Sequence, residues 1–173
     1  MFSYTQLADQ LNECKKTKRK TILIGVTYAL LDFIEQYSIH FPELIVMETG
    51  GMKGRRVELL RTEVHGLLKD GFGVEAIHSE YGMTELLSQA YSKGKGIFSS
   101  SKTLKVFTRQ VNDPYQQCAF GKQGILQVID LANINSCAFI ETQDLAIVHS
   151  NHTFEILGRV DNTDIRGCNL LYT

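Results

Sequence analysis

Apolar and polar positions along the first half of the chain switch between helical and strand-like spacing. From Tyr4 to Lys16, apolar side chains recur at close to helical spacing, which predicts a surface helix. Short apolar runs predict strands at residues 21–26, 44–47 and 74–78. The first run is continuously apolar, which is typical of a strand buried on both faces. Helical patterns over residues 28–37 and 54–71 separate the runs.

The predicted order of elements indicates a fold class. A β-α-β-α-β order within about sixty residues is that of a parallel three-layer unit with right-handed crossovers. After residue 88, short β-type segments follow, divided by turn signals: residues 103–111, 124–131, 137–140, 145–148 and 154–157. We therefore expect an α/β fold, with a nucleotide-binding-type subdomain at 1–88 and a β-rich, mixed or antiparallel subdomain at 89–173. Both would be parts of one larger domain.

Three loops follow the predicted strands, at residues 25–28, 48–54 and 79–85. In parallel sheets, ligands bind where the C-terminal ends of the strands open into loops. The three loops are therefore expected to line one edge of the sheet, and this edge is the predicted site.

Charge and cysteine content narrow the classes of partner. The net charge of −1 over 173 residues predicts no nucleic-acid partner and no anionic membrane surface. The basic run at residues 15–20 is interpreted as a solvated helix end rather than a nucleic-acid patch. Four scattered cysteines, without a CxxC pair, predict a reduced, cytoplasmic protein. No apolar run approaches the roughly 20 residues of a membrane span.

The loop at residues 48–54 contains Gly50 and Gly51 and precedes a predicted helix. Glycines let the backbone approach a ligand closely, and the amides of a helix N-terminus suit anions. The spacing is not that of a Walker A motif. A nucleotide-binding loop and an ordinary strand-to-helix turn are equally open interpretations.

The segment Tyr81-Gly82-Met83-Thr84-Glu85 is dense in polar groups. The ring of Tyr81 could stack on a purine and Thr84 could donate to a phosphate oxygen. Glu85 could hold Mg²⁺, a hard cation that takes carboxylate ligands alongside phosphates. The alternative is that Thr84 and Glu85 simply start a helix.

Asp144 and Arg159 lie on neighbouring predicted strands. An aspartate can accept hydrogen bonds from both hydroxyls of a ribose, and an arginine can reach ribose or phosphate. The alternative is a hairpin that carries a surface ion pair.

Together, these motifs resemble the C-terminal half of adenylate-forming enzymes, the acyl-CoA synthetase superfamily. Residues 81–85 are similar to the superfamily's YGxTE signature, residues 142–144 to its TGD and residues 158–167 to its GRxD…G hinge region. The nearest branches by resemblance are the LuxE-like acyl-protein synthetases and the phenylacetate-CoA ligases. Segments 78–86, 130–133 and 164–168 are similar to the LuxE-like group in particular.

The resemblance implies a ligation that uses ATP and Mg²⁺. A carboxylic acid, for example a fatty acid, forms an acyl-adenylate, and a thiol then takes the acyl group. That thiol is CoA in acyl-CoA ligases and an enzyme cysteine near the C-terminus in acyl-protein synthetases, where Cys168 lies here. Arg166 would favour the Cys168 thiolate; the alternative is a small buried hydrophobe. Implied partners are the acid and an acyl-transfer protein.

The chain also departs from the resemblance. It lacks the superfamily's glycine- and Ser/Thr-rich phosphate loop and its C-terminal lysine, and Gln143 replaces the glycine of TGD. These differences predict a fragment that is inactive without the N-terminal half of the enzyme. Two alternatives remain: a non-catalytic nucleotide- or acyl-binding module, and a structural fragment that self-associates as a homo-oligomer through an apolar face or sheet edge.

Overall fold

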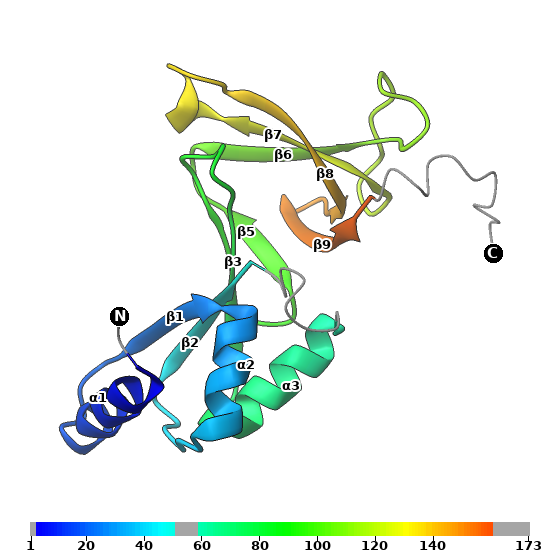
Figure 1. The fold of residues 1–173 in the computed structure, drawn as a ribbon. Coiled ribbons are helices and arrows are strands. Elements are labelled where there is room, and N and C mark those ends of the chain that lie inside the picture. The colour runs from blue at the N-terminus through cyan, green and yellow to red at the C-terminus, as the bar shows by residue number, and fades with distance from the viewer. Residues whose placement is uncertain (1–2, 51–58, 161–173) are drawn as a thin grey trace. The chain divides into compact units, whose positions relative to one another are not determined.

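The computed structural model describes residues 3–50 and 59–160 (Figure 1). The chain divides into two compact units. Unit 1 comprises residues 1–82 and 91–96, and unit 2 comprises residues 83–90 and 97–173.

Unit 1 is a parallel α/β unit. Its elements in chain order are α1 (Tyr4–Lys16), β1 (Ile22–Val26), α2 (Thr27–Gln36), β2 (Ile45–Thr49), α3 (Arg61–Phe72), β3 (Ile77–Tyr81) and most of β4 (Ala90–Ser92). Strand β1 pairs in parallel with β2, and β2 in parallel with β3. The predicted β-α-β-α-β order is therefore confirmed, with α2 and α3 as the two crossover helices (Figure 1).

Local signals explain where the helices begin and end. Ser3 Oγ accepts from Gln6 N at 3.2 Å and Gln6 Oε1 accepts from Ser3 N at 2.9 Å, which is a capping box for α1. Helix α3 begins at Arg61, not near the predicted Gly54, and Glu63 Oε2 accepts from Leu60 N at 2.8 Å at that end. It ends at Phe72, and the cap residue Gly73 that follows has a φ of 66°, in the left-handed region.

Aromatic rings form the centre of the unit 1 core. Phe33 on α2 is 1% exposed and Phe72 at the end of α3 is fully buried. The two rings stack with centroids 5.8 Å apart, Tyr37 stacks on Phe33 at 5.4 Å, and Tyr4 of α1 makes an edge contact with Phe33 at 5.8 Å. One apolar cluster thus joins all three helices to the sheet residues Val46 and Ile77.

The other face of β1 and β2 is open among the described residues. Ile22 and Ile24 are 59% and 58% exposed, and Ile45 is 39% exposed. The expectation that β1 is buried on both faces is therefore wrong. One face of β1 is exposed because α1, α2 and α3 share one apolar cluster with the sheet and so cover the same face.

Unit 2 is an antiparallel sheet. Its elements are β5 (Ile97–Ser100), β6 (Leu104–Arg109), β7 (Gln123–Asp130), the short 3₁₀ helix η1 (Leu131–Asn133), β8 (Phe139–Val148) and β9 (Thr153–Arg159). The strands are ordered β5-β9-β8-β7-β6, and each adjacent pair is antiparallel. Phe98 and Phe154 stack with centroids 5.4 Å apart inside this sheet's core.

The α/β class, with a parallel unit followed by a β-rich antiparallel part, is confirmed. Several boundaries differ from the prediction. β3 begins at Ile77 rather than Val74 and runs into the polar motif as far as Tyr81. Residues 139–140 and 145–148 belong to one strand, β8, which pairs with β7 on both sides of a register shift between Glu141 and Leu145.

Candidate functional site

A buried carboxylate lies where the parallel strands of unit 1 end. Glu48 on β2 is 6% exposed, and its Oε2 accepts a hydrogen bond from Thr27 Oγ1 at 2.8 Å. Its Oε1 lies 3.6 Å from His65 Nε2 on α3, and Ser79 Oγ on β3 lies 3.4 Å from the same nitrogen. These four side chains, which we call the Glu48 network, join α2, β2, α3 and β3 at one edge of the sheet.

Glu48 is held in its ionised form. Burial by itself would raise its pKa, but hydrogen bonds from His65, Ser79 and Thr27, together with the charge of Arg61, outweigh burial and lower the pKa below its ordinary value of 4.5. The network is therefore an anion fixed by directed donors at the strand ends.

The Glu48 network is not a nucleophile-activating triad, although it contains the same residue types. In a triad, the serine and the carboxylate contact opposite nitrogens of the imidazole. Here Ser79 and Glu48 both face Nε2 of His65. Ser79 is also 0% exposed, so no substrate reaches its hydroxyl. The network therefore holds the strand ends in place.

The glycine-rich loop starts beside this network. Thr27 Oγ1 lies 3.2 Å from Gly50 O, and Gly50 has a φ of 72°, a conformation that favours glycine. The structure thus gives a backbone reason for Gly50. Gly51 lies outside the described residues, so the role of the two glycines in a pocket stays a prediction.

The segment Tyr81–Glu85 is divided between a strand end and a tight turn. Half-buried Tyr81 is the last residue of β3, and exposed Gly82 follows it. Leu86 N donates to Met83 O at 3.0 Å, so Thr84 and Glu85 are the central residues of a turn. Both are exposed, and the segment is not helical. The alternative of a helix start is therefore wrong.

The turn is anchored by Asp130, the last residue of β7, which is 0% exposed. Its Oδ2 accepts from Leu87 N at 2.8 Å and from Ser88 N at 2.9 Å, and its Oδ1 accepts from Ser88 Oγ at 2.6 Å. Asn133 Nδ2 on η1 donates to Glu85 O at 2.7 Å. We call Asp130 and Asn133 the clamp.

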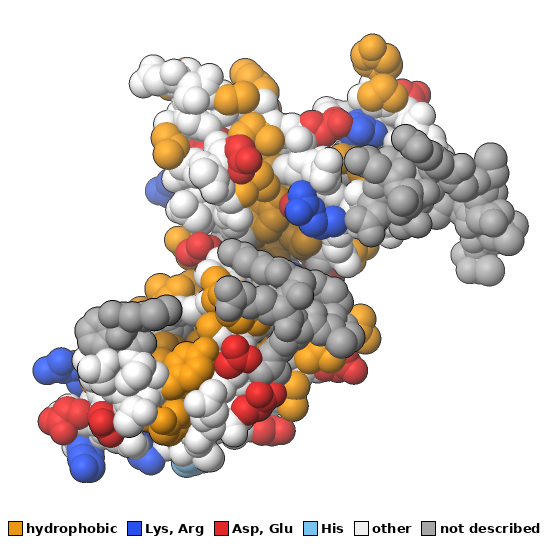
Figure 2. Space-filling view, in the orientation of Figure 1, with side chains coloured by type: hydrophobic (Ala, Val, Ile, Leu, Met, Phe, Trp, Pro, Cys, Tyr) orange, Lys and Arg blue, Asp and Glu red, His pale blue; other side chains and the backbone are white. Residues whose placement is uncertain are grey.

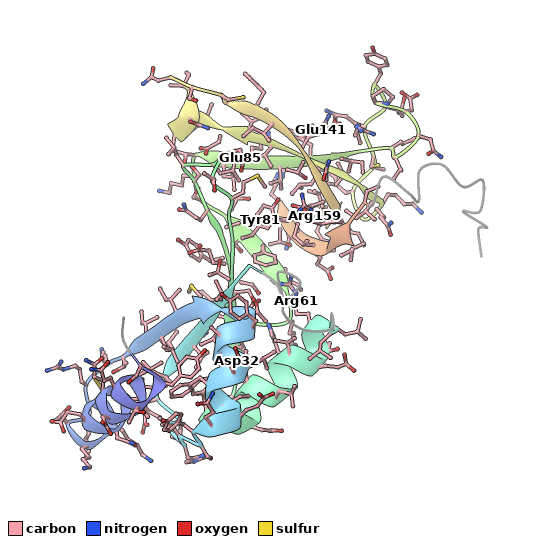
Figure 3. The ribbon with its side chains drawn as sticks, viewed as in Figure 1. Asp32, Arg61, Tyr81, Glu85, Glu141 and Arg159 are labelled. Carbon is pink, nitrogen blue, oxygen red and sulfur yellow. The ribbon has the colours of Figure 1, made fainter. Side chains whose placement is uncertain are left out.

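Asp144 and Arg159 form a cross-strand pair in unit 2. They are register partners on β8 and β9, and Arg159 Nε lies 3.8 Å from Asp144 Oδ1. The arginine side chain is 72% exposed and the aspartate 15%. At this exposure the pair contributes at most about 1 kcal/mol to stability. The surface pair anticipated as the alternative is therefore present, and it leaves the guanidinium in contact with solvent. Figure 3 labels Arg159 on β9.

The structure places the predicted site residues in two groups. Gly50 and Tyr81 lie at the C-terminal ends of β2 and β3 in unit 1. Thr84, Glu85 and the Asp144–Arg159 pair belong to unit 2. Cys168 and the hinge residue Asp161, like Gly51, lie outside the described residues.

Sequence reasoning gave no role to Thr27, Glu48, His65, Ser79 or Asp130. The signal for Glu48 was a carboxylate at the end of an apolar run. The signal for Asp130 was its place in residues 130–133, which we noted only for their resemblance to LuxE-like proteins.

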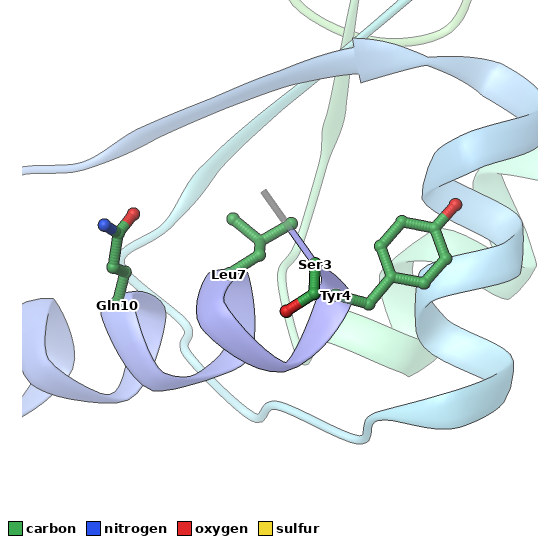
Figure 4. Close-up of a pocket in the computed structure, with 4 residues that line it drawn as sticks. All are labelled: Ser3, Tyr4, Leu7 and Gln10. Atoms are coloured by element: carbon green, nitrogen blue, oxygen red, sulfur yellow. The ribbon is translucent and has the colours of Figure 1, made fainter. Parts of the chain in front are cut away.

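Two surface depressions among the described residues lie away from the predicted site residues. One of ≈ 260 Å³ lies along α1 and is lined by Ser3, Tyr4, Leu7 and Gln10, without a charged group (Figure 4). Another, of ≈ 240 Å³, lies between β6 and residues 117–120 in unit 2. Neither includes a predicted site residue.

Over residues 3–50 and 59–160, no three His, Cys, Asp or Glu side chains gather to hold a metal ion. An exposed carboxylate such as Glu85 fits Mg²⁺ in the way that this ion is usually bound, by one or two carboxylates together with substrate phosphates and water. The described helices include none that is long and apolar enough to cross a membrane.

Comparison with solved structures shows the fold of adenylate-forming ligases. ATP-bound MatB from Rhodopseudomonas palustris matches with a TM-score of 0.67 and 15% identity over 91% of this chain and 33% of its own. A long-chain-fatty-acid-CoA ligase (FadD1) from Archaeoglobus fulgidus matches with a TM-score of 0.60 and 13% identity over 92% of this chain and 37% of its own. O-succinylbenzoate Coenzyme A synthetase (MenE) from Bacillus subtilis, in complex with ATP and magnesium ion, matches with a TM-score of 0.60 and 18% identity. This match covers 91% of the present chain and 34% of MenE.

The chain belongs to the acyl-protein synthetase (LuxE) family, whose sequence profile matches residues 2–173. The predicted membership of the superfamily and of its LuxE-like branch is therefore confirmed. None of the curated proteins compared with the chain matches it. The chain spans about a third of the length of the ligases with which it shares its fold (33% for MatB).

Proposed function

We propose that the chain contributes one part of the nucleotide site of an ATP-dependent, carboxylate-activating ligase. In the first step, a carboxylate oxygen bonds to the α-phosphorus of ATP, and pyrophosphate leaves with the electrons of the broken P–O bond. In the second, a thiolate bonds to the acyl carbon of the adenylate and AMP leaves. Family membership over residues 2–173 supports the class of reaction.

Each predicted residue has a role that its chemistry and position support. Tyr81 stacks on adenine from the end of β3. Thr84 donates to a phosphate oxygen, and Glu85 holds the Mg²⁺ that neutralises charge on the phosphates. Asp144 accepts from the ribose hydroxyls and Arg159 reaches ribose or phosphate. Gly50 and Gly51 shape the wall of the pocket.

One observation carries this proposal. Thr84 and Glu85 are the exposed central residues of a turn, while Leu86 and Ser88 after them are 4% and 5% exposed. Burial of these two residues and the clamp thus fix the turn from inside, and the hydroxyl of Thr84 and the carboxylate of Glu85 project to the surface beside exposed Leu87. A turn with a solely structural purpose does not require this pair of side chains.

The acyl acceptor is proposed to be the thiol of Cys168, with CoA as the alternative. The acyl-protein synthetase family supports an enzyme cysteine, and the CoA ligases that share the fold support CoA. The carboxylic acid is proposed to be a fatty acid, and an acyl-transfer protein would be a further partner.

Calorimetry with Mg·ATP tests the proposed role of Glu85. The Glu85→Gln variant should bind Mg·ATP about tenfold more weakly, a loss of about 1.4 kcal/mol, because the amide is a poorer ligand for Mg²⁺. Its affinity for AMP without Mg²⁺ should equal that of the wild type. Glu75→Gln, at another exposed glutamate, is the matched control. Equal Mg·ATP affinity in the wild type and in Glu85→Gln contradicts the assignment.

A second candidate is self-association through the open face of β1 and β2, which is favoured by exposed Ile22, Ile24 and Ile45. Apolar side chains reach the surface of both units (Figure 2). If this candidate is right, sedimentation velocity should show a dimer fraction that increases with protein concentration. The double variant Ile22→Glu/Ile24→Glu should be monomeric at the same concentrations. Leu60→Glu, at a position that is 70% exposed, leaves the dimer intact. A wild-type chain that is monomeric at every concentration rules out this candidate.

A further inference from the structure

The clamp directs its hydrogen bonds at the backbone of the Thr84–Glu85 turn. Asp130 accepts from two consecutive amides, Leu87 N and Ser88 N, and from the Ser88 hydroxyl. It also accepts from Ala132 N at 3.1 Å, which fixes its own position at the start of η1. Asn133 Nδ2 bridges two carbonyls, Glu85 O at 2.7 Å and Cys137 O at 2.9 Å. Residues 85–88 are thus held at three backbone positions.

A buried carboxylate is unfavourable by itself, because it loses its hydration. Burying it costs free energy that its partners must offset, and well-packed apolar residues are often as stabilising as a buried charged group. What the Asp130 carboxylate adds is direction, because charge-assisted bonds to backbone N–H groups are short and have narrow geometry. The observed bonds of 2.8 and 2.9 Å from Leu87 N and Ser88 N are of this kind.

We propose that Asp130 and Asn133 are positioning residues for the reaction. They fix the backbone of residues 85–88 so that the Glu85 carboxylate and the Thr84 hydroxyl are presented to the phosphates and Mg²⁺. The proposal rests on the proposed function of Thr84 and Glu85. Asp130 and Asn133 themselves touch no ligand, since they are 0% and 7% exposed.

The variant Asp130→Asn keeps the shape of the side chain and changes its donors. In either orientation of the amide, its NH₂ group faces backbone N–H donors: those of Leu87 and Ser88 in one, and that of Ala132 in the other. Asp113→Asn is the matched control, because Asp113 also accepts from a backbone amide, Tyr115 N, but in the connection between β6 and β7.

Hydrogen exchange tests the clamp without any ligand. In the wild type the amides of Leu87 and Ser88 should be protected although neither lies in a strand. In Asp130→Asn the amides that lose their acceptor, those of Leu87 and Ser88 in one orientation of the new amide and that of Ala132 in the other, should exchange on the order of tenfold faster. The amides of Leu126 and Val128 inside β7 should keep their rates. Unprotected Leu87 and Ser88 amides in the wild type overturn the proposal.

Nucleotide affinity then separates positioning from general stability. The dissociation constant for Mg·ATP should rise about fivefold to tenfold in Asp130→Asn, in the same direction as for Glu85→Gln, while AMP binds both variants and the wild type equally. In the double variant Asp130→Asn/Glu85→Gln, the loss of Mg·ATP affinity should be smaller than the sum of the two single losses, because both changes weaken the contact of Glu85. An additive double variant, or an equal loss of AMP and Mg·ATP affinity, overturns the proposal.

Asn133→Ala provides a second test should Asp130→Asn fail to fold. It removes the donor to Glu85 O and leaves the bonds of Asp130 in place, and it should weaken Mg·ATP but not AMP. A wild-type chain that binds no nucleotide, yet has protected Leu87 and Ser88 amides, contradicts the proposed function and leaves the clamp as a structural device. In that case the proposed positioning role of Asp130 and Asn133 is overturned, although their hydrogen bonds to the turn are confirmed.

Discussion

Replacing Phe33 by alanine is expected to lower the free energy of unfolding of unit 1 by about 3–5 kcal/mol. Phe33 is 1% exposed and its ring contacts Tyr4, Tyr37 and Phe72. Truncation removes the apolar area of the ring, its stacking contacts and the packing of α1, α2 and α3 around it. A cavity between helices relaxes only partly, so the loss belongs at the upper end of core substitutions.

Urea denaturation followed by far-ultraviolet circular dichroism measures this loss. The described α-helices all belong to unit 1, so the helical signal reports on that unit. Phe139→Ala provides the matched control in unit 2, because Phe139 is 74% exposed and should change stability by no more than about 0.5 kcal/mol. A Phe33→Ala midpoint equal to that of the wild type contradicts the assignment of the core.

Replacing Glu48 by alanine should destabilise unit 1 by about 3 kcal/mol at neutral pH. The variant leaves the hydroxyl of Thr27, the imidazole of His65 and the hydroxyl of Ser79 without their shared acceptor in a buried site. Because Thr27 also lies beside Gly50, the start of the glycine-rich loop should lose order as well.

The pH dependence separates the charge of Glu48 from its volume. Hydrogen bonds and Arg61 hold the pKa of Glu48 below its ordinary value despite burial. A lowered pKa in the folded state contributes stability above the pKa of the unfolded state, and that stability is lost as pH falls through the folded-state pKa. Glu48→Gln should therefore be less stable than the wild type near neutral pH and should lose less stability on acidification.

Urea midpoints measured from neutral pH down to below pH 4.5, the ordinary pKa of the group, test this expectation. Asp130 and Glu141 also have lowered pKa values, so some acid sensitivity should persist in the variant. If the urea midpoints of the wild type and of Glu48→Gln change equally with pH, Glu48 is not ionised in the folded protein.

The order of elements could be read from the sequence because each apolar run of unit 1 is a strand or a helix face. Val46 and Ile77 are buried as the pattern predicts. The environment of β1 could not be read, since a continuous apolar run looks the same whether one face or both are covered. Ile22 and Ile24 differ from Leu23 only through the helices packed on one side.

Site residues could be predicted where neighbouring residues in the sequence indicate their chemistry. They could not be predicted where their role depends on contacts between distant parts of the chain. Thr84 and Glu85 could be selected from their neighbours in the chain. The clamp could not, because Asp130 contacts Leu87 and Ser88 across more than forty residues of sequence (separations of 43 and 42). Strands β4 and β5 were also missed, since Ala90–Ser92 and Ile97–Ser100 are short and rich in serine.

Residue-level mapping of nucleotide binding tests the central claim most directly. Backbone amide spectra of the 173-residue chain, recorded with and without Mg·ATP, should show the largest shifts at Gly50, at residues 81–85 and at Asp144 and Arg159. The phosphate-dependent shifts at Thr84 and Glu85 should disappear when AMP replaces Mg·ATP. Shifts confined to the basic run at residues 15–20, or no shifts at all, would contradict a nucleotide site built on the Thr84–Glu85 turn.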